Sequence, residues 1–276
     1  MPPASVTPTL VHKESASVRR MFGSIARRYD LVNHVLSGGL DVLWRRAAVR
    51  ELLVELGARR GEPPGRSNDA GAPRGAAPAG HRVLDLCAGT LDLSCALSDS
   101  RRFHGKAFAL DFALPMLRRG RHKLGGRRSR HIAPLCADAL RLPFPDAAFD
   151  AAMVAFGVRN LEDLEAGLSE TRRVLAPGGR LIVLEFSQPP NPVFRGLYGL
   201  YSRSVLPAVG GALSGEREAY RYLPDSVAAF DDAPALRARL LRAGFAAARF
   251  RPLSGGIVAL HVARKPIADD GARDLD

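Results

Sequence analysis

A glycine and a carboxylate stand where a nucleoside ligand could be held. Gly89 follows the apolar stretch that begins at His81, and Asp111 ends a second apolar stretch 22 residues later. A glycine after the first strand of an α/β sheet lets the backbone approach a ligand, and a carboxylate ending the second strand can accept hydrogen bonds from both ribose hydroxyls. An ordinary turn glycine and a solvent-facing aspartate are the alternative, but the combination of strand, turn, helix and carboxylate favours a ligand site.

The loop around Gly89 argues against a dinucleotide. Loops that bind pyrophosphate carry G-x-G-x-x-G, whereas residues 88–93 contain a single glycine. Asp92 stands at the predicted start of the next helix, where its charge would repel a pyrophosphate. A cationic ligand without phosphate suits this loop better, and S-adenosylmethionine is such a ligand.

Alternating strands and helices must position this loop. The pattern predicts strands over 81–86, 106–111, 131–136, 149–156 and 180–186, helices over 92–100, 114–124 and 162–175, and a turn at 176–179. Such alternation, with right-handed crossovers, predicts an α/β fold with a doubly wound, Rossmann-like parallel sheet. Further helices are predicted over 15–56 (interrupted at 37–39), 193–226 and 234–244, and edge strands near 246–252 and 256–264.

One segment departs from this pattern. Residues 61–80 contain 14 Gly, Pro or Ala and no large hydrophobic residue, which predicts a disordered insertion. We therefore expect a flexible N-terminus over 1–14, a single domain over 15–265 that contains the insertion, and a flexible acidic tail over 266–276.

The composition limits the class of protein. The 276 residues are 46% hydrophobic and 25% charged, which are globular values. No window approaches 18 apolar residues and the first 20 lack an apolar core, so neither a transmembrane helix nor a signal peptide is predicted. The three cysteines show no CxxC spacing, so we expect a reducing cytosol and no metal site. The net charge of +12 favours nucleic acid, an anionic membrane or an anionic small ligand as partner.

Eight motifs, in this order along the chain, resemble a known family. They are MFGSIARRYDLVN (21–33), SGGL with LWR (37–45), LPFPD with FD (142–150), FGVRN (156–160), RVL with PGG (173–179), LEFS (184–187), YRYLP (220–224) and GGIVALH (255–261). Together they resemble the UbiE/MenG-type ubiquinone and menaquinone C-methyltransferases, which are class I S-adenosylmethionine enzymes. The resemblance runs from about residue 18 to 265, apart from the insertion.

The resemblance implies a cofactor site. Thr90 would line the methionine end, and Asp138 with Ala139 would meet the adenine. The full set that it implies for S-adenosylmethionine is Asp85, Gly89, Thr90, Asp111, Asp138 and Ala139.

Asp138 is a mild departure from the family pattern, which often has asparagine there. Two other departures lie near the site: the family loop runs glycine-threonine-glycine, but here Leu91 is the third residue, and Ala155 replaces a usual serine. Leucine at a positive φ would cost about 1–2 kcal/mol, and we expect its side chain to fill cofactor space. These departures motivate the alternative of a non-catalytic paralogue in a quinone-biosynthesis assembly.

The family methylates a ring carbon of a polyprenylated quinol, and for this chain demethylmenaquinol is favoured over a ubiquinone precursor. The reaction needs orientation and removal of a phenolic proton. We expect Arg159 and Asn160 at the substrate face, where they would stabilise a quinolate oxygen or orient a water. His261, Tyr220 and Tyr222 are further candidates, each with the alternative of a packed side chain.

The acceptor's isoprenoid tail implies contact with a membrane. We expect a cytoplasmic enzyme that associates peripherally with the inner face of the membrane. A homo-oligomer and a quinone-biosynthesis complex both stay open as its assembly. Segment 193–213 would form a lipid-tail entrance, an interfacial helix or a core-packing helix. The basic residues between 118 and 130 would contact anionic headgroups or form a solvated loop.

Two other substrate classes compete with a quinol. A sterol or tocopherol-like phenol stays open. A nucleic-acid methyltransferase is disfavoured, because residues 154–160 lack the Pro-Pro-aromatic motif of amino-methylating enzymes and no cysteine follows a proline. We therefore expect no nucleic-acid partner.

Overall fold

The computed structural model describes residues 15–26, 28–59 and 80–267. The predicted flexible N-terminus, insertion and acidic tail lie outside these residues, apart from Gly80, Pro266 and Ile267.

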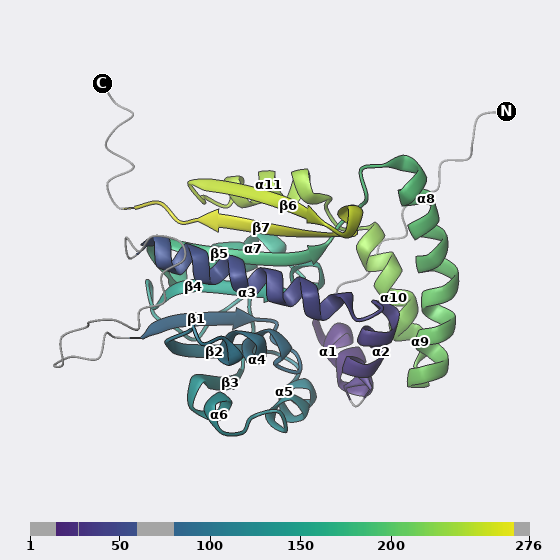
Figure 1. Cartoon of the computed structure of the whole chain (residues 1–276), viewed down its shortest axis with the longest axis horizontal. Coiled ribbons are helices and arrows are strands. Elements are labelled where there is room, and N and C mark those ends of the chain that lie inside the picture. Colours follow the sequence, from purple (N-terminus) through teal and green to yellow (C-terminus); the bar gives the residue numbers. More distant parts are fainter. Residues whose placement is uncertain (1–14, 27, 60–79, 268–276) are drawn as a thin grey trace.

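A seven-stranded mixed sheet forms the centre of the molecule (Figure 1). Its strands are β1 (His81–Leu86), β2 (Gly105–Asp111), β3 (Ile132–Cys136), β4 (Phe149–Ala155), β5 (Leu175–Phe186), β6 (Ala247–Leu253) and β7 (Val258–Arg264). Their order is β3-β2-β1-β4-β5-β7-β6; β1 to β5 pair in parallel, and β7 is antiparallel to both neighbours. The predicted doubly wound α/β fold is confirmed.

Helices cover both faces of the sheet, because successive strand residues point to opposite sides. Val83 packs with α3 (Leu40–Arg59) and α4 (Asp92–Asp99), whereas its neighbour Leu84 packs with α7 (Leu164–Val174) and α11 (Ala233–Arg242). The shorter helices α5 (Leu114–Arg121) and α6 (Arg127–His131) lie beside β2 and β3 (Figure 1).

A second group of helices gathers at one end of the sheet, where the parallel strands end (Figure 1). It contains α1 (Ser15–Ile25), α2 (Tyr29–Leu36), α8 (Pro192–Leu200), the π-helical turn η2 (Tyr201–Val205), α9 (Leu206–Ser214) and α10 (Arg217–Ala228). Their shared apolar cluster joins Ile25 and Val32 to Leu206 and Tyr220. The N-terminal helices and the late excursion therefore form one cap over this end.

Three details differ from the expected elements. The helical region 15–56 has the predicted interruption, where Gly38 and Gly39 turn the chain with φ of 59° and 79°, but it also has an unpredicted break between Ile25 and Tyr29 and so forms three helices. The short helix α6 was not predicted. The turn at 176–179 lies inside β5 as a bulge, since the pairing partner shifts from Leu175 opposite Phe149 to Arg180 opposite Ala151.

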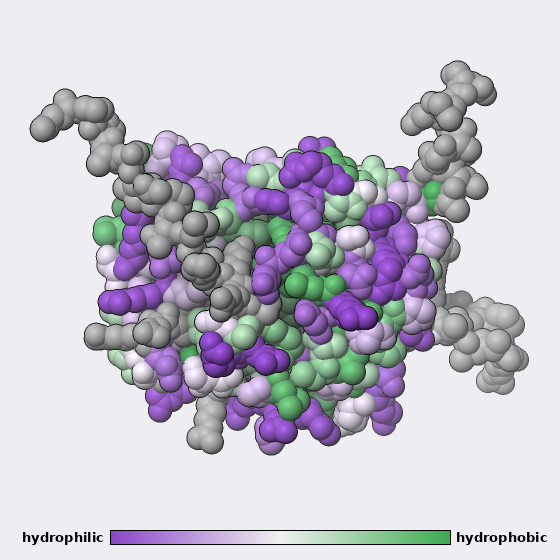
Figure 2. All heavy atoms as spheres, turned by 180° about the vertical axis from the view of Figure 1, so that it is seen from behind, coloured by the Kyte–Doolittle hydropathy of each residue, from purple (hydrophilic) through white to green (hydrophobic). Residues whose placement is uncertain are grey.

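The described residues contain no helix long and apolar enough to cross a membrane. Seen from behind the sheet, hydrophilic and apolar side chains are interspersed over the surface (Figure 2).

Candidate functional site

A cavity of about 670 Å³, including its open mouth, lies at the carboxyl ends of β1, β2 and β4. In the sheet order, β1 stands between β2 and β4, so the chain reverses its direction of progress across the sheet at this point. Ligands of open α/β sheets bind at such switch points. The cavity is therefore where the fold class places a ligand.

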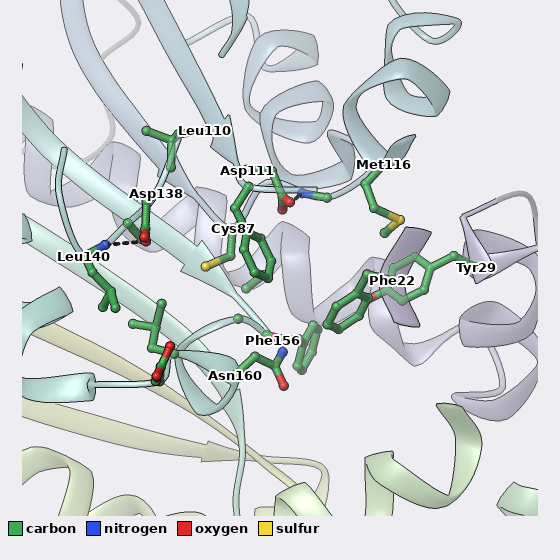
Figure 3. Close-up of a pocket in the computed structure, with 17 residues that line it drawn as sticks. Phe22, Tyr29, Cys87, Leu110, Asp111, Met116, Asp138, Leu140, Phe156 and Asn160 are labelled. Atoms are coloured by element: carbon green, nitrogen blue, oxygen red, sulfur yellow. Dashed lines mark hydrogen bonds between the residues drawn. The ribbon is translucent and has the colours of Figure 1, made fainter. Parts of the chain in front are cut away.

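Asp111 is fixed at the end of β2 by two backbone donors. Its Oδ2 accepts from Gly89 N at 2.8 Å (Figure 3). Its Oδ1 accepts from Ala113 N, also at 2.8 Å. Burial raises the pKa of this carboxyl, and the two N–H donors oppose that rise. Each oxygen keeps a second lone pair for a ligand, which suits the two hydroxyls of a ribose.

Asp138 and Ala139, which follow β3, line the same cavity. Asp138 Oδ1 accepts from Leu140 N at 2.9 Å, which orients the carboxylate. Leu110, Leu140 and Ala139 surround it with apolar surface. An apolar wall beside one hydrogen-bond acceptor fits an adenine ring and its amino group.

Three aromatic rings face the carboxylates across the cavity (Figure 3). Phe22 and Tyr29 come from the N-terminal helices, and Phe156 follows β4 with a left-handed φ of 60°. The Phe22 and Tyr29 rings meet edge to face at 6.0 Å. Aromatic faces attract cations, so this side is suited to a sulfonium.

A second, larger cavity of about 1190 Å³ adjoins the first one. Phe22, Tyr29 and Phe156 line both cavities. The rest of its wall is largely apolar or aromatic, with contributions from Met21, Ile25, Leu36, Leu40, Trp44, Phe186, Tyr198, Tyr201, Leu206, Tyr220, Tyr222, Leu223 and Ile257. This cavity suits a flat, apolar acceptor placed next to the cofactor.

Arg159 lines the second cavity and is 4% exposed. Its Nη1 donates to Glu185 Oε1 at 2.8 Å and to Phe156 O at 2.6 Å, and its guanidinium lies 5.2 Å from the Phe186 ring centroid. Glu185 is fully buried and also accepts from Arg159 N at 3.3 Å. Sequence reasoning missed Glu185 as a positioning residue, although it lies in the LEFS motif.

Asn160 lines the first cavity, although its neighbour Arg159 lines the second. Both belong to the short 3-10 turn η1 (Val158–Asn160). The Tyr222 hydroxyl donates to Asn160 Oδ1 at 3.1 Å, and burial raises the pKa of Tyr222. The predicted pair therefore stands at the junction of the two cavities, and Tyr222 is next to it.

Three predicted site residues are not among those lining either cavity. Asp85 is buried inside β1, where it accepts from Ser94 Oγ at 2.5 Å and burial raises its pKa to about 7. His261 is buried in β7, within 3.1 Å of Ala233 O. These positions match packed strand residues. Thr90, the third, is turned toward α2.

Thr90 donates to Asp30 Oδ1 at 2.5 Å, and Lys123 Nζ lies 2.7 Å from Asp30 Oδ2. Lys123 also pairs with Asp92 at the start of α4. Asp30 thus joins the N-terminal helices to the cofactor loop and to the chain after α5. It is a second missed residue, since the contact bridges 60 positions of sequence.

Leu91 takes the left-handed conformation expected of it, with a φ of 70°. The expectation that its side chain fills cofactor space is wrong: the side chain is fully buried in a cluster with Cys95, Leu117 and Ile132. Gly120 leaves the room, because a Cβ there would lie 2.5 Å from Leu91 Cγ. The leucine side chain therefore stabilises the loop by packing into this buried cluster.

Comparison with known proteins agrees with this geometry. Residues 10–265 match the model of the ubiE/COQ5 methyltransferase family. The chain belongs to this family. It is 46% identical to the demethylmenaquinone methyltransferase of Thermus thermophilus over 89% of the chain and all of the relative, and 43% identical to that of Beutenbergia cavernae over 92% of each.

Solved structures share the fold. A methyltransferase solved in complex with the Haloferax volcanii Trm112 methyltransferase activator has a TM-score of 0.55 at 16% identity, covering 89% of this chain and 97% of that one. A SAM-dependent methyltransferase from Thermotoga maritima has a TM-score of 0.53 at 16% identity, covering 89% of this chain and 98% of that one.

This member of the ubiE/COQ5 family is a methyltransferase that uses S-adenosylmethionine. The residues of the first cavity fit that cofactor: Asp111 for the ribose, Asp138 for the adenine amino group, and Tyr29 and Phe156 beside the sulfonium. The reading as a non-catalytic paralogue loses its main support, because Leu91 does not enter this cavity. Ala155 does line it, without a polar group.

Proposed function

We propose that the chain transfers a methyl group to a ring carbon of a polyprenylated demethylmenaquinol. Its relatives from Thermus thermophilus and Beutenbergia cavernae are named demethylmenaquinone methyltransferases, which supports this acceptor. The observation that carries the proposal is the turn η1, which presents Arg159 to the apolar acceptor cavity and Asn160 to the cofactor cavity. Asp41 and Arg45 also line this cavity and form an ion pair with each other. A cation such as Arg159 in a largely apolar cavity is suited to a ring that becomes anionic during the reaction.

The residues of η1 would prepare the ring for attack. S-adenosylmethionine supplies a methyl group on a positively charged sulfur. Arg159 keeps its proton, so we assign it electrostatic stabilisation of the quinolate oxygen rather than the role of base. Glu185 holds the guanidinium in place at 2.8 Å. Asn160 would orient a water that takes the phenolic proton, with its own amide fixed by Tyr222.

In the transfer step, the ring carbon of the quinolate would form a bond to the methyl carbon as the bond from methyl to sulfur breaks, which leaves a neutral thioether. The methylated ring carbon would then lose its proton to water, and the quinolate oxygen would take up a proton from water, which gives the aromatic quinol. The largely apolar walls would lower the local dielectric constant around the ring, which strengthens the interaction between Arg159 and the developing charge.

The test is methyl transfer from labelled S-adenosylmethionine to demethylmenaquinol by the purified chain. We expect carbon-methylated product, and a loss of about 10²–10³ in kcat for Arg159→Ala with cofactor affinity retained. The exposed Arg46→Ala variant on α3 is the matched control. Methylation of a demethylated ubiquinone precursor or another lipophilic phenol in preference to demethylmenaquinol would overturn the assigned acceptor, and near-normal turnover of Arg159→Ala would overturn its role.

We also propose that the cap meets the membrane that holds the acceptor. Large apolar side chains are exposed on α2, α3, α8 and η2: Leu31, Val35, Leu40, Leu43, Val193, Leu197, Leu200 and Val205. Residues 192–214 carry Arg195 and Arg203 and no acidic residue, so this surface complements anionic lipid. The basic residues near α5 support the proposal less, because Lys123, Arg127 and Arg128 are engaged within the chain.

A further inference from the structure

A third hollow, of about 1670 Å³ with its open side, lies beyond the acceptor cavity. It is bounded by residues of α8 and η2 on one side and of α10 on the other, and by the chain after β5. The residues that line both this groove and the acceptor cavity are Phe186, Tyr198, Leu206 and Leu223. The two spaces therefore share one apolar wall.

One side of the groove is suited to a hydrocarbon chain, and the chain after β5 adds the polar side chains of Ser187 and Gln188. Its lining from α10 and the following turn is mainly apolar: Leu223, Pro224, Val227, Ala228 and Ala229, with Asp225 as a carboxylate. On the opposite side, Gly199 contributes no side chain and leaves space open. Arg195 and Arg203, both exposed, add positive charge to the same lining.

The helix that separates the groove from the acceptor cavity contains the π-helical turn η2. Such turns are rare in proteins as a whole, and those that occur often lie at functional sites. The Tyr201 hydroxyl donates to Leu36 O at 2.7 Å and Tyr201 lines the acceptor cavity, whereas the next two residues, Ser202 and Arg203, line the groove. The turn thus divides neighbouring residues between the two spaces.

We propose that this groove binds the isoprenoid tail of the acceptor while the ring lies in the adjoining cavity. The tail would cross from one space to the other beside Tyr198, Leu206 and Leu223, which line both. The proposal rests on the proposed function, since it takes the acceptor to be a polyprenylated quinol. The new part of the proposal is the position of the tail. It also names the residues that determine how strongly tail length affects affinity.

The chain offers a matched pair of variants on α8. Gly199 lines the groove, and the nearest heavy atom to a Cβ built there is Arg203 Nη2 at 3.9 Å. Gly196, one turn earlier, is exposed, does not line the groove, and would place a Cβ with no atom within 4 Å. Gly199→Leu and Gly196→Leu therefore add the same side chain to the same helix, but only the first one narrows the groove.

The test compares two acceptors, demethylmenaquinol with several isoprene units and the same ring with none. We expect Gly199→Leu to raise KM for the long acceptor about tenfold or more and to leave the tailless acceptor within about twofold, with Gly196→Leu unchanged on both. An equal effect on both acceptors, or no effect on either one, would overturn the groove as the tail site.

Direct binding separates this proposal from the proposed function. A polyprenol of the same chain length, which has no ring to methylate, should bind the wild-type chain and Gly196→Leu in calorimetry and bind Gly199→Leu at least tenfold more weakly. If that pattern appears while demethylmenaquinol is not methylated, the groove stands and the assigned acceptor ring is wrong. If polyprenol binds all three chains equally, the groove is not the tail site.

Discussion

At the scale of single residues, Leu91 replaces a favoured glycine yet is fully buried. Leu91→Gly removes backbone strain of about 1–2 kcal/mol but also a buried side chain worth about 2–4 kcal/mol. We therefore expect a net loss of up to about 3 kcal/mol in the free energy of unfolding, measured with urea. Affinity for S-adenosylmethionine, measured by calorimetry, should change by less than about threefold. A large gain in affinity would contradict the observed direction of the side chain.

Asp85 should make stability depend on pH. Burial raises its pKa from 3.8 to about 7 in the folded chain, so the folded state binds the proton more tightly than the unfolded state. Stability from this group is therefore lost as pH rises through the window between those values. Relative to wild type, Asp85→Asn should gain about 2 kcal/mol in the free energy of unfolding between pH 5 and pH 8. A difference that stays constant across that range would show that the carboxyl titrates normally.

At the scale of elements, Asp30 links the cap to Thr90 in the cofactor loop and to Lys123 after α5. Asp30→Asn keeps the size of the side chain but weakens the pairing with Lys123, so Tyr29 and Phe22 would be held less firmly over the cofactor. We expect affinity for S-adenosylmethionine to fall about three- to tenfold in calorimetry. Asp99→Asn is the matched control, because Asp99 pairs with Arg128 away from both cavities. Equal losses in the two variants would argue against a specific link.

The sequence predicted the strands well because their apolar stretches are short, buried and bounded by turns. It predicted the neighbourhood of Gly89, Asp111 and Asp138 because the ends of parallel strands meet at one edge. It could not show which way Asp85 and Thr90 point, since that depends on partners that only the fold brings close. The PGG sequence predicts a turn in either setting, so it could not show that residues 176–179 form a bulge within β5.

At the scale of the whole molecule, one end carries the cavities and the exposed apolar side chains of the cap. We expect the chain to bind vesicles that contain anionic lipid more tightly than zwitterionic ones, with binding that weakens as salt rises. Leu197→Gln with Leu200→Gln should reduce binding about tenfold or more, because both side chains are about two-thirds exposed, at 63% and 66%.

The matched control changes Arg118 and Arg119, exposed on α5, to alanine. Cosedimentation with vesicles measures all three chains. Binding that ignores both lipid charge and salt would remove the electrostatic part of the membrane proposal, and a larger loss from the arginine variant would move the contact from the cap to α5.

The close packing of Gly120 against the loop after β1 also restricts which residue position 120 can hold. A Cβ at position 120 would clash with Leu91 Cγ at 2.5 Å and with the Thr90 backbone at 2.8 Å. The contact with the Thr90 backbone does not depend on the side chain at 91, so position 120 requires glycine whichever residue stands at 91. We therefore expect Gly120→Ala to displace the loop after β1 in the wild-type chain and in the Leu91→Gly variant alike.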